Sequence, residues 1–110
     1  MIYHNPRCSK SRESLKILEE AKASVQVVEY LKNPLTESEL KEVLKKLGIP
    51  AKDILRTKES IFQELKVDLE NEDEIIKAIV DHPILLERPI VVSNNRAVIG
   101  RPPENVLNLL

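Results

Sequence analysis

The stretch MIYHNPRCSKSRESLKILEEAKA, residues 1–23, predicts a strand, a turn and a helix in immediate succession. Met1–Tyr3 is short and apolar, and the polar His-Asn-Pro sequence that follows ends it, as expected for a brief strand before a turn. From Ser9 to about Ala23 the apolar residues recur at helical spacing, with charged residues on the opposite side. The chain therefore opens with the first two elements of a β-α-β unit.

A second strand and a capped helix follow. Val25–Leu31 is rich in β-branched residues and is ended by an Asn-Pro pair, which predicts a strand. Thr36 and Glu39 have the spacing of a capping box, so a helix is expected to begin there and to run to Leu47. Residues 50–82 then predict several short helical pieces.

The C-terminal part of the sequence predicts a hairpin and a final helix. Pro89–Val92 has the composition of a strand, Ser93–Asn95 that of a tight turn, and Ala97–Ile99 that of the partner strand. The proline pair that begins at Pro102 opens a last helix, which is expected to end at Leu110.

This order of elements, β-α-β, then helices, then β-β-α, indicates an α/β fold. The first unit should be parallel with a right-handed crossover and the hairpin antiparallel, which gives a mixed four-stranded sheet flanked by helices. The order matches that of the thioredoxin fold with extra helices inserted in its middle. We therefore expect a single thioredoxin-like domain over residues 1–110, arranged as βαβ–(helical insertion)–ββα, with the insert at about residues 36–82.

The composition narrows the class of protein. The formal net charge is -1, so no global basic field attracts nucleic acid, and aromatic residues at 3% argue against a base-stacking surface. A single cysteine cannot form an internal disulfide, no signal peptide is predicted, and no apolar run has the length of a membrane span. We expect a reduced, cytoplasmic protein that associates with neither nucleic acid nor membrane.

The single cysteine, Cys8, lies where the first strand gives way to the first helix. Unpaired N–H groups at a helix start favour the thiolate form, and the nearby Arg7 and Arg12 act in the same direction. The loop from Cys8 to Ser11 can also wrap an oxyanion with amides and hydroxyls. The alternative, a buried cysteine in the core, fits poorly with so polar a stretch. A nucleophile beside an anion site is the better interpretation.

Several known types of cysteine or metal site are excluded by spacing. Arg12 follows Cys8 after only three residues, whereas a tyrosine-phosphatase loop needs five, and Ser11 stands where a dithiol motif needs its second cysteine. Ser11 can hydrogen-bond a thiolate but cannot form a disulfide with it, so an external thiol must regenerate any adduct of Cys8. His4 and Cys8 are too few for a metal, and none is expected; His4 can instead hydrogen-bond the loop or add positive charge.

Arginines at strand ends suggest where an oxyanion would be held. Arg88 and Arg101 each precede a proline, and in a thioredoxin-like arrangement both could converge on the end of the first strand, with Arg56 reaching in from the helical insert. Alternatively each is a surface arginine paired with a nearby glutamate, as Glu87 beside Arg88 suggests.

Three stretches resemble the glutaredoxin-coupled arsenate reductase family: YHNPRCSKSR from Tyr3, HPILLERPIVV from His82 and IGRPPE from Ile99, with ILRTKE from Ile54 fitting the arginine of the family's helical insert. The resemblance implies that Cys8 attacks arsenate and that three arginines hold the oxyanion, namely Arg56, Arg88 and Arg101. It further implies that His4 and Ser11 tune the cysteine and that Pro89 is a cis-proline facing it. Arg12 is expected to tune the cysteine as well, through its charge rather than through the resemblance.

The resemblance also implies the partners. Glutathione attacks the adduct as co-substrate, glutaredoxin resolves the mixed disulfide, arsenite is released, and no bound cofactor is needed; we expect a monomer. Arg7 and Ser9 depart from the small residue and the glycine that flank the cysteine in the better-established arsenate reductases. Two alternatives therefore stay open: a glutathione-dependent reductase of mixed disulfides, and a regulator resembling the Spx type, which binds RNA polymerase but usually keeps two cysteines where this chain has Ser11.

Overall fold

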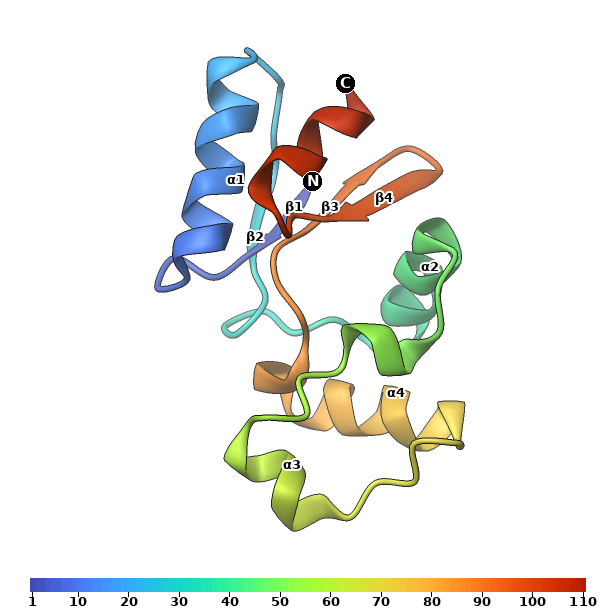
Figure 1. Cartoon of the computed structure of the whole chain (residues 1–110). Helices are drawn as coiled ribbons and strands as arrows, with labels where there is room; N and C mark the ends of the chain where they lie inside the picture. Colours follow the sequence, from blue (N-terminus) through green and yellow to red (C-terminus); the bar gives the residue numbers. More distant parts are fainter. The chain divides into compact units, whose positions relative to one another are not determined.

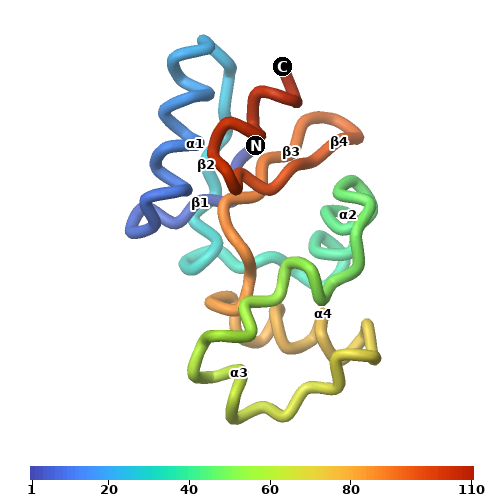
Figure 2. The backbone as a smooth tube through the Cα atoms, in the orientation of Figure 1, coloured from blue at the N-terminus to red at the C-terminus, as the bar shows by residue number.

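The computed structural model describes residues 1–110, and the chain forms two compact units (Figures 1 and 2). The first unit combines Met1–Asn33 with Arg88–Leu110 and contains the sheet; the second spans Pro34–Glu87 and contains the inserted helices. The second unit is slightly longer at both ends than the insert that the sequence predicts. That the two act as one domain stays a prediction.

The first unit is built on a mixed four-stranded sheet of order β2-β1-β3-β4. β1 pairs in parallel with β2 and antiparallel with β3, which pairs antiparallel with β4. The prediction of an α/β fold with such a sheet is confirmed. The four strands are β1 (Ile2–His4), β2 (Val27–Glu29), β3 (Ile90–Ser93) and β4 (Arg96–Ile99).

The first helix, α1 (Ser9–Glu20), is shorter than its apolar pattern predicts. Lys22 takes the left-handed backbone conformation, with φ of 60°, and the Ala23 N–H donates to the carbonyl of Leu18 at 3.0 Å, which closes the helix early. β2 is also shorter than expected because the N–H groups of residues 32 and 33 both turn back onto the Glu29 carbonyl.

The C-terminal part of the unit follows the predicted order with two differences. The hairpin loop has two residues rather than three, and Asn94 adopts φ of 53°, which asparagine tolerates well. The last helix, η3 (Pro103–Leu109), is a 3₁₀ helix that begins one residue later than predicted. Both α1 and η3 lie side by side, as the ribbon and the tube show (Figures 1 and 2).

The core of this unit lies between the sheet and these two helices. Ile2 and Val91 from neighbouring strands meet Leu18 of α1 and Val106 of η3, and each of the four side chains is almost fully buried. This packing holds α1, whose N-terminal end begins at Cys8, against the sheet.

The second unit is helical and has its own apolar interior. The capping box at the start of its first helix is confirmed: Thr36 Oγ1 accepts from the Glu39 N–H at 3.1 Å, and Glu39 Oε1 accepts from the Thr36 N–H at 2.9 Å. Gly48 ends that helix with φ of 70°. The elements are α2 (Glu37–Leu47), η1 (Ala51–Ile54), α3 (Ser60–Leu65), α4 (Glu72–Asp81) and η2 (Pro83–Leu85).

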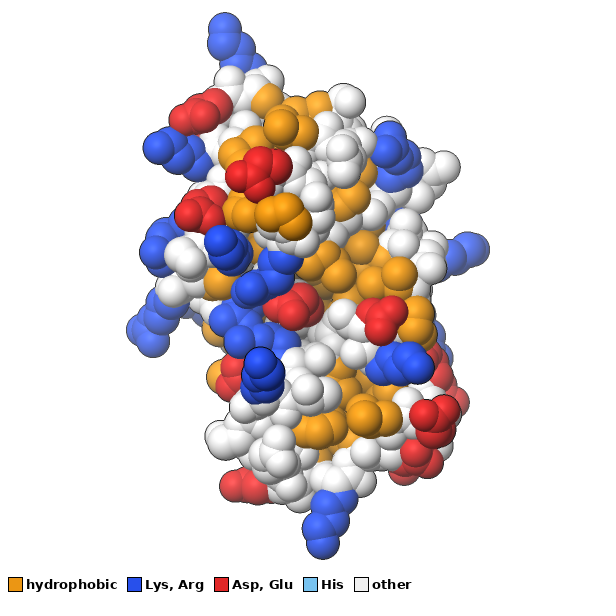
Figure 3. Space-filling view, in the orientation of Figure 1, with side chains coloured by type: hydrophobic (Ala, Val, Ile, Leu, Met, Phe, Trp, Pro, Cys, Tyr) orange, Lys and Arg blue, Asp and Glu red, His pale blue; other side chains and the backbone are white.

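The surface carries both signs of charge. On the face drawn in Figure 3, lysine, arginine, aspartate and glutamate side chains are all present, several lysine and arginine side chains lie next to one another, and apolar side chains lie between the charged groups. None of the helices combines the length with the apolarity that crossing a membrane requires. Any preference for an anion must therefore come from a local arrangement of charges.

Candidate active site

Cys8 occupies the N-cap position of α1, in an extended conformation with φ of −98° and ψ of 123°. Its carbonyl accepts the first helical hydrogen bond, from the Arg12 N–H at 3.0 Å, and its own N–H donates to the Asn5 carbonyl at 3.0 Å. The residue is 8% exposed and is a free thiol. The sulfur thus lies at the positive end of the helix dipole, next to N–H groups that have no partner within the helix.

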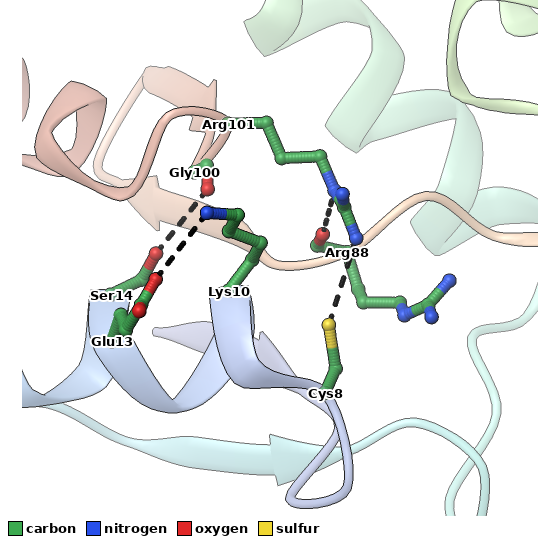
Figure 4. A network of polar contacts seen from close by, with 7 residues as sticks. All are labelled: Cys8, Lys10, Glu13, Ser14, Arg88, Gly100 and Arg101. Carbon is green, nitrogen blue, oxygen red and sulfur yellow. Dashed lines mark hydrogen bonds and ion pairs between the residues drawn. The ribbon is translucent and has the colours of Figure 1, made fainter.

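Arg101 donates a hydrogen bond to this sulfur. Its Nη2 lies 3.6 Å from Cys8 Sγ, while its Nε donates to the Arg88 carbonyl at 2.8 Å (Figure 4). The carbonyl therefore holds one edge of the guanidinium while another edge points at the sulfur. A guanidinium so placed can stabilise negative charge on the sulfur or on an oxyanion joined to it.

Arg88 and Arg101 are brought together by the two ends of the hairpin. Arg88 precedes β3 and is half-buried, and Arg101 follows β4. The Arg88–Pro89 peptide bond is cis, the conformation that the resemblance assigns to Pro89, and the Arg101–Pro102 bond is cis as well. The structure thus places two of the three predicted arginines beside Cys8 (Figure 4).

His4 and Ser11 form a buried polar pair beneath the loop. His4 Nδ1 lies 2.6 Å from Ser11 Oγ, and the same oxygen accepts from the Asn5 N–H at 3.0 Å. Burial lowers the pKa of His4 from its usual value; Glu29 opposes this shift and the positive charge of Arg12 adds to it. The imidazole is therefore neutral near pH 7.

Ser11 reaches the loop rather than the sulfur. The sequence suggests that its hydroxyl could bond a thiolate, but the hydroxyl is used by His4 and the Asn5 amide. These bonds link Ser11 to the start of the Asn5–Cys8 loop, and its role in tuning Cys8 stays a prediction.

Two further hydrogen bonds fix that loop. Arg12 Nη1 donates to the Pro6 carbonyl at 3.0 Å, and the Arg7 N–H donates to Asn5 Oδ1 at 3.0 Å. Arg12 thus binds the loop backbone, while the predicted effect of its charge on Cys8 stays a prediction, and Arg7 is exposed. Both bonds restrict the backbone just before the sulfur.

Arg56 lies in the second unit. Its Nη1 forms an ion pair of 2.8 Å with Glu59 Oε1, and its N–H donates to the Leu85 carbonyl at 2.8 Å. This is the pairing with a nearby glutamate that the sequence analysis left open for each arginine. The role of Arg56 in holding an oxyanion stays a prediction.

Sequence reasoning missed two residues that border the site, Ser14 and Gly100. Ser14 Oγ, fully buried in α1, donates to the Gly100 carbonyl at 3.5 Å (Figure 4). Gly100 directly precedes Arg101. A serine on the buried stripe of a helix, and one of only two glycines in the chain, were the available signals. No group of three metal-ligating side chains is found.

Comparison with known proteins gives consistent matches over nearly the whole chain. The sequence model of the ArsC family matches residues 3–109. The chain is 49% identical over 108 residues to the arsenate reductase of Neisseria meningitidis, which covers 96% of this chain and 92% of that protein. It is 44% identical over 113 residues to the arsenate reductase of Haemophilus influenzae, with 100% and 97% covered.

The solved structure of an arsenate reductase from Vibrio cholerae matches with a TM-score of 0.95 at 43% identity. The match covers 100% of this chain and 96% of that one. The fold observed here is therefore shared along its full length with a solved relative.

Proposed function

This chain belongs to the ArsC family, and from that premise we propose that it reduces arsenate to arsenite through an adduct on Cys8. The observation that carries the proposal is the placement of Cys8 Sγ at the N-terminus of α1, 3.6 Å from Arg101 Nη2. A nucleophile and a cation lie together, as attack on a tetrahedral oxyanion requires. The names of the similar proteins support arsenate as that oxyanion.

In the first step the Cys8 sulfur attacks the arsenic of arsenate. An S–As bond forms and one hydroxyl of arsenate leaves as water with the proton that the thiol gave up, so arsenic stays pentavalent. Arg101 neutralises the oxygens of the adduct, and the helix N–H groups near Cys8 donate to them. Arg88, and Arg56 from the second unit, are the further arginines that we assign to the oxyanion.

In the second step an external thiol attacks the Cys8 sulfur. The S–As bond breaks and its electron pair goes to arsenic, which leaves as trivalent arsenite, while the new S–S bond joins Cys8 to the incoming thiol. A second thiol then releases Cys8 and forms the external disulfide. One arsenate and two thiols thus give one arsenite, one disulfide and one water.

The external thiols follow from the presence of a single cysteine. We assign the first to glutathione and the release of Cys8 to glutaredoxin, because the reduction needs two electrons and the chain has only one thiol to give. Under this proposal the protein acts in a reducing cytoplasm, as a monomer and without a bound cofactor.

The test is a coupled assay of NADPH consumption with arsenate, glutathione, glutaredoxin and glutathione reductase. We expect turnover from the wild-type protein and none above background from Cys8→Ser, which keeps the size of the side chain and removes the nucleophile. Ser24→Ala is the matched control, because Ser24 is an exposed serine beyond the end of α1, outside the Cys8–Ser11 loop, and is expected to leave turnover unchanged.

The same assay separates the alternatives. Absence of arsenate turnover in a folded protein whose Cys8 still reacts with iodoacetamide contradicts arsenate reduction. Cys8-dependent turnover of a glutathione mixed disulfide would then identify a thiol reductase. Binding to RNA polymerase that survives Cys8→Ser would identify a regulator.

A further inference from the structure

We propose that Ser14 and Gly100 are positioning residues that place Arg101 over the Cys8 sulfur. Gly100 lies between β4 and Arg101, and Ser14 faces it from the helix that begins at Cys8 (Figure 4). The inference rests on the proposed function only in taking Cys8 as the reactive group. It concerns how the cation is held there rather than which oxyanion is bound.

The backbone at Gly100 passes too close to its neighbours to carry a side chain. A Cβ at this position would overlap Ser14 Oγ and would lie 2.7 Å from Pro89 Cγ. Carbon atoms in contact prefer separations of about 3.5–4.0 Å, so a methyl group here must displace both the Ser14 hydroxyl and the ring of Pro89. Its φ is not in the left-handed region, so close approach is what requires glycine.

The Ser14 hydroxyl is directed at this backbone. Ser14 is 0% exposed, and its one hydrogen bond goes to the Gly100 carbonyl at 3.5 Å. A buried hydroxyl without a partner is costly, so the hydroxyl favours the position of Gly100 in which that carbonyl is within reach. Because the bond is long, its main effect is on orientation.

Gly100 is in turn tied to the segment that holds Arg101. The Gly100 N–H donates to the Pro89 carbonyl at 2.9 Å, and Arg101 Nε donates to the carbonyl of the preceding Arg88 at 2.8 Å. The two segments flanking the hairpin are therefore joined at both residues. A shift of Gly100 moves the backbone of Arg101 with it.

The contact between Ser14 and Gly100 fastens this pair of segments to α1. Cys8 and Ser14 lie on the same helix, about 9 Å apart along its axis. The distance from the guanidinium of Arg101 to the sulfur is thus set at both ends by α1. Loss of the Ser14 contact loosens that distance without removing any charge.

The test measures the rate of Cys8 alkylation by iodoacetamide against pH, for the wild type, Ser14→Ala, Arg101→Ala and the double variant. We expect Arg101→Ala to move the midpoint of the profile to higher pH, because the variant loses the positive charge that lies beside the sulfur. Ser14→Ala should move it part of the way. The double variant should match Arg101→Ala alone, because Ser14 acts only through that arginine.

Leu18→Val is the matched control. Leu18 is 2% exposed and lies one turn beyond Ser14 on the buried side of α1. Its apolar side chain cannot form a hydrogen bond to Gly100. The variant weakens the packing of α1 and is expected to leave the midpoint unchanged. Gly100→Ala, where it folds, should shift the midpoint further than Ser14→Ala does.

Two results overturn the proposal. The first is that folded Ser14→Ala has the same midpoint as the wild type. The second is that the double variant has a higher midpoint than Arg101→Ala alone. The alkylation reaction contains no arsenate. If the midpoints shift as expected but arsenate is not turned over, only the proposed function is contradicted. If arsenate is turned over but Ser14→Ala leaves the midpoint unchanged, only the positioning role is contradicted.

Discussion

The interiors of the two units differ in chemistry. All three buried polar residues of the chain, His4, Ser11 and Ser14, belong to the first unit and lie on β1 and α1 around Cys8. The second unit buries only apolar side chains, which come mainly from α2 and α4 and from the two short 3₁₀ helices. Buried polar groups thus lie around Cys8, the proposed nucleophile, and are absent from the second unit.

This difference separates stability from function. Apolar burial stabilises the second unit directly, in proportion to the area removed from water. The polar groups of the first unit add little net stability while they are paired, yet each becomes costly when its partner is removed. The interior of the first unit is therefore more sensitive to the loss of a single polar group, and those polar groups fix the arrangement around the sulfur.

The largest effect is expected in the apolar unit. Leu40→Ala removes a side chain of α2 that is 0% exposed and should lower the free energy of unfolding by about 2–5 kcal/mol, because a cavity replaces packed atoms. Urea denaturation followed by circular dichroism measures it. Leu69→Ala is the control, since Leu69 is 42% exposed and should change stability by less than about 0.5 kcal/mol. Equal losses of stability in both variants would contradict the claim that apolar burial stabilises the second unit.

The polar interior of the first unit gives the next effect. Ser11→Ala leaves His4 Nδ1 and the Asn5 N–H without their shared partner, and should cost about 1–3 kcal/mol by the same denaturation. The deleted oxygen contributes almost no apolar area, so a loss of this size measures polar satisfaction alone. Ser9→Ala, at an exposed serine in the same helical turn, should be nearly neutral. A neutral Ser11→Ala would show that water replaces the hydroxyl.

A capping variant tests a polar contact of the second unit, the N-cap of α2 at Thr36. Thr36→Ala removes the side-chain oxygen that accepts from the Glu39 N–H and should lower stability by about 1 kcal/mol. The loss is smaller than at Ser11 because the groups left behind are exposed to water. Glu39→Gln, which keeps an acceptor at the same place, should retain most of the stability. A loss larger than that of Ser11→Ala would reverse the order expected here.

Much of this architecture could be predicted from local patterns. The capping box at Thr36, the glycine that ends α2 and the strands of the hairpin depend on neighbours in sequence, and each is found where expected. The C-terminal ends of α1 and β2 were predicted too long, because apolar periodicity continues past Glu20 and Glu29 while turn hydrogen bonds end both elements.

The site could be predicted only in part, for the opposite reason. Cys8, Arg88 and Arg101 were found because reactive and charged residue types stand out in a sequence. Ser14 and Gly100 were missed because their importance comes from a contact between residues 86 positions apart, and no local pattern announces such a contact. Arg12 was predicted to favour the thiolate through its charge, which stays a prediction; that its guanidinium also binds the Pro6 carbonyl could not be read from the sequence.

The smallest effect concerns protonation of the polar interior. Burial holds the pKa of His4 below its usual value, against the attraction of Glu29 and with the repulsion of Arg12. Between the folded and the unfolded pKa the unfolded chain binds more protons, so stability rises with pH across that window. Above about pH 6.5 the imidazole is neutral in both states, and His4 does not change the free energy of unfolding with pH. Below that pH the free energy of unfolding falls, until the folded imidazole is itself protonated. One group contributes a slope of at most about 1.4 kcal/mol per pH unit.

Urea denaturation of wild type and His4→Asn between pH 7.5 and pH 5 measures this contribution. The free energy of unfolding of the variant is subtracted from that of the wild type at each pH, so that the contributions of the other titrating groups cancel. We expect the difference to be flat above the window and to fall within it. A difference that stays flat throughout would mean that His4 is hydrated in the folded protein. It would contradict the conclusion that the polar groups of the first unit are buried away from water.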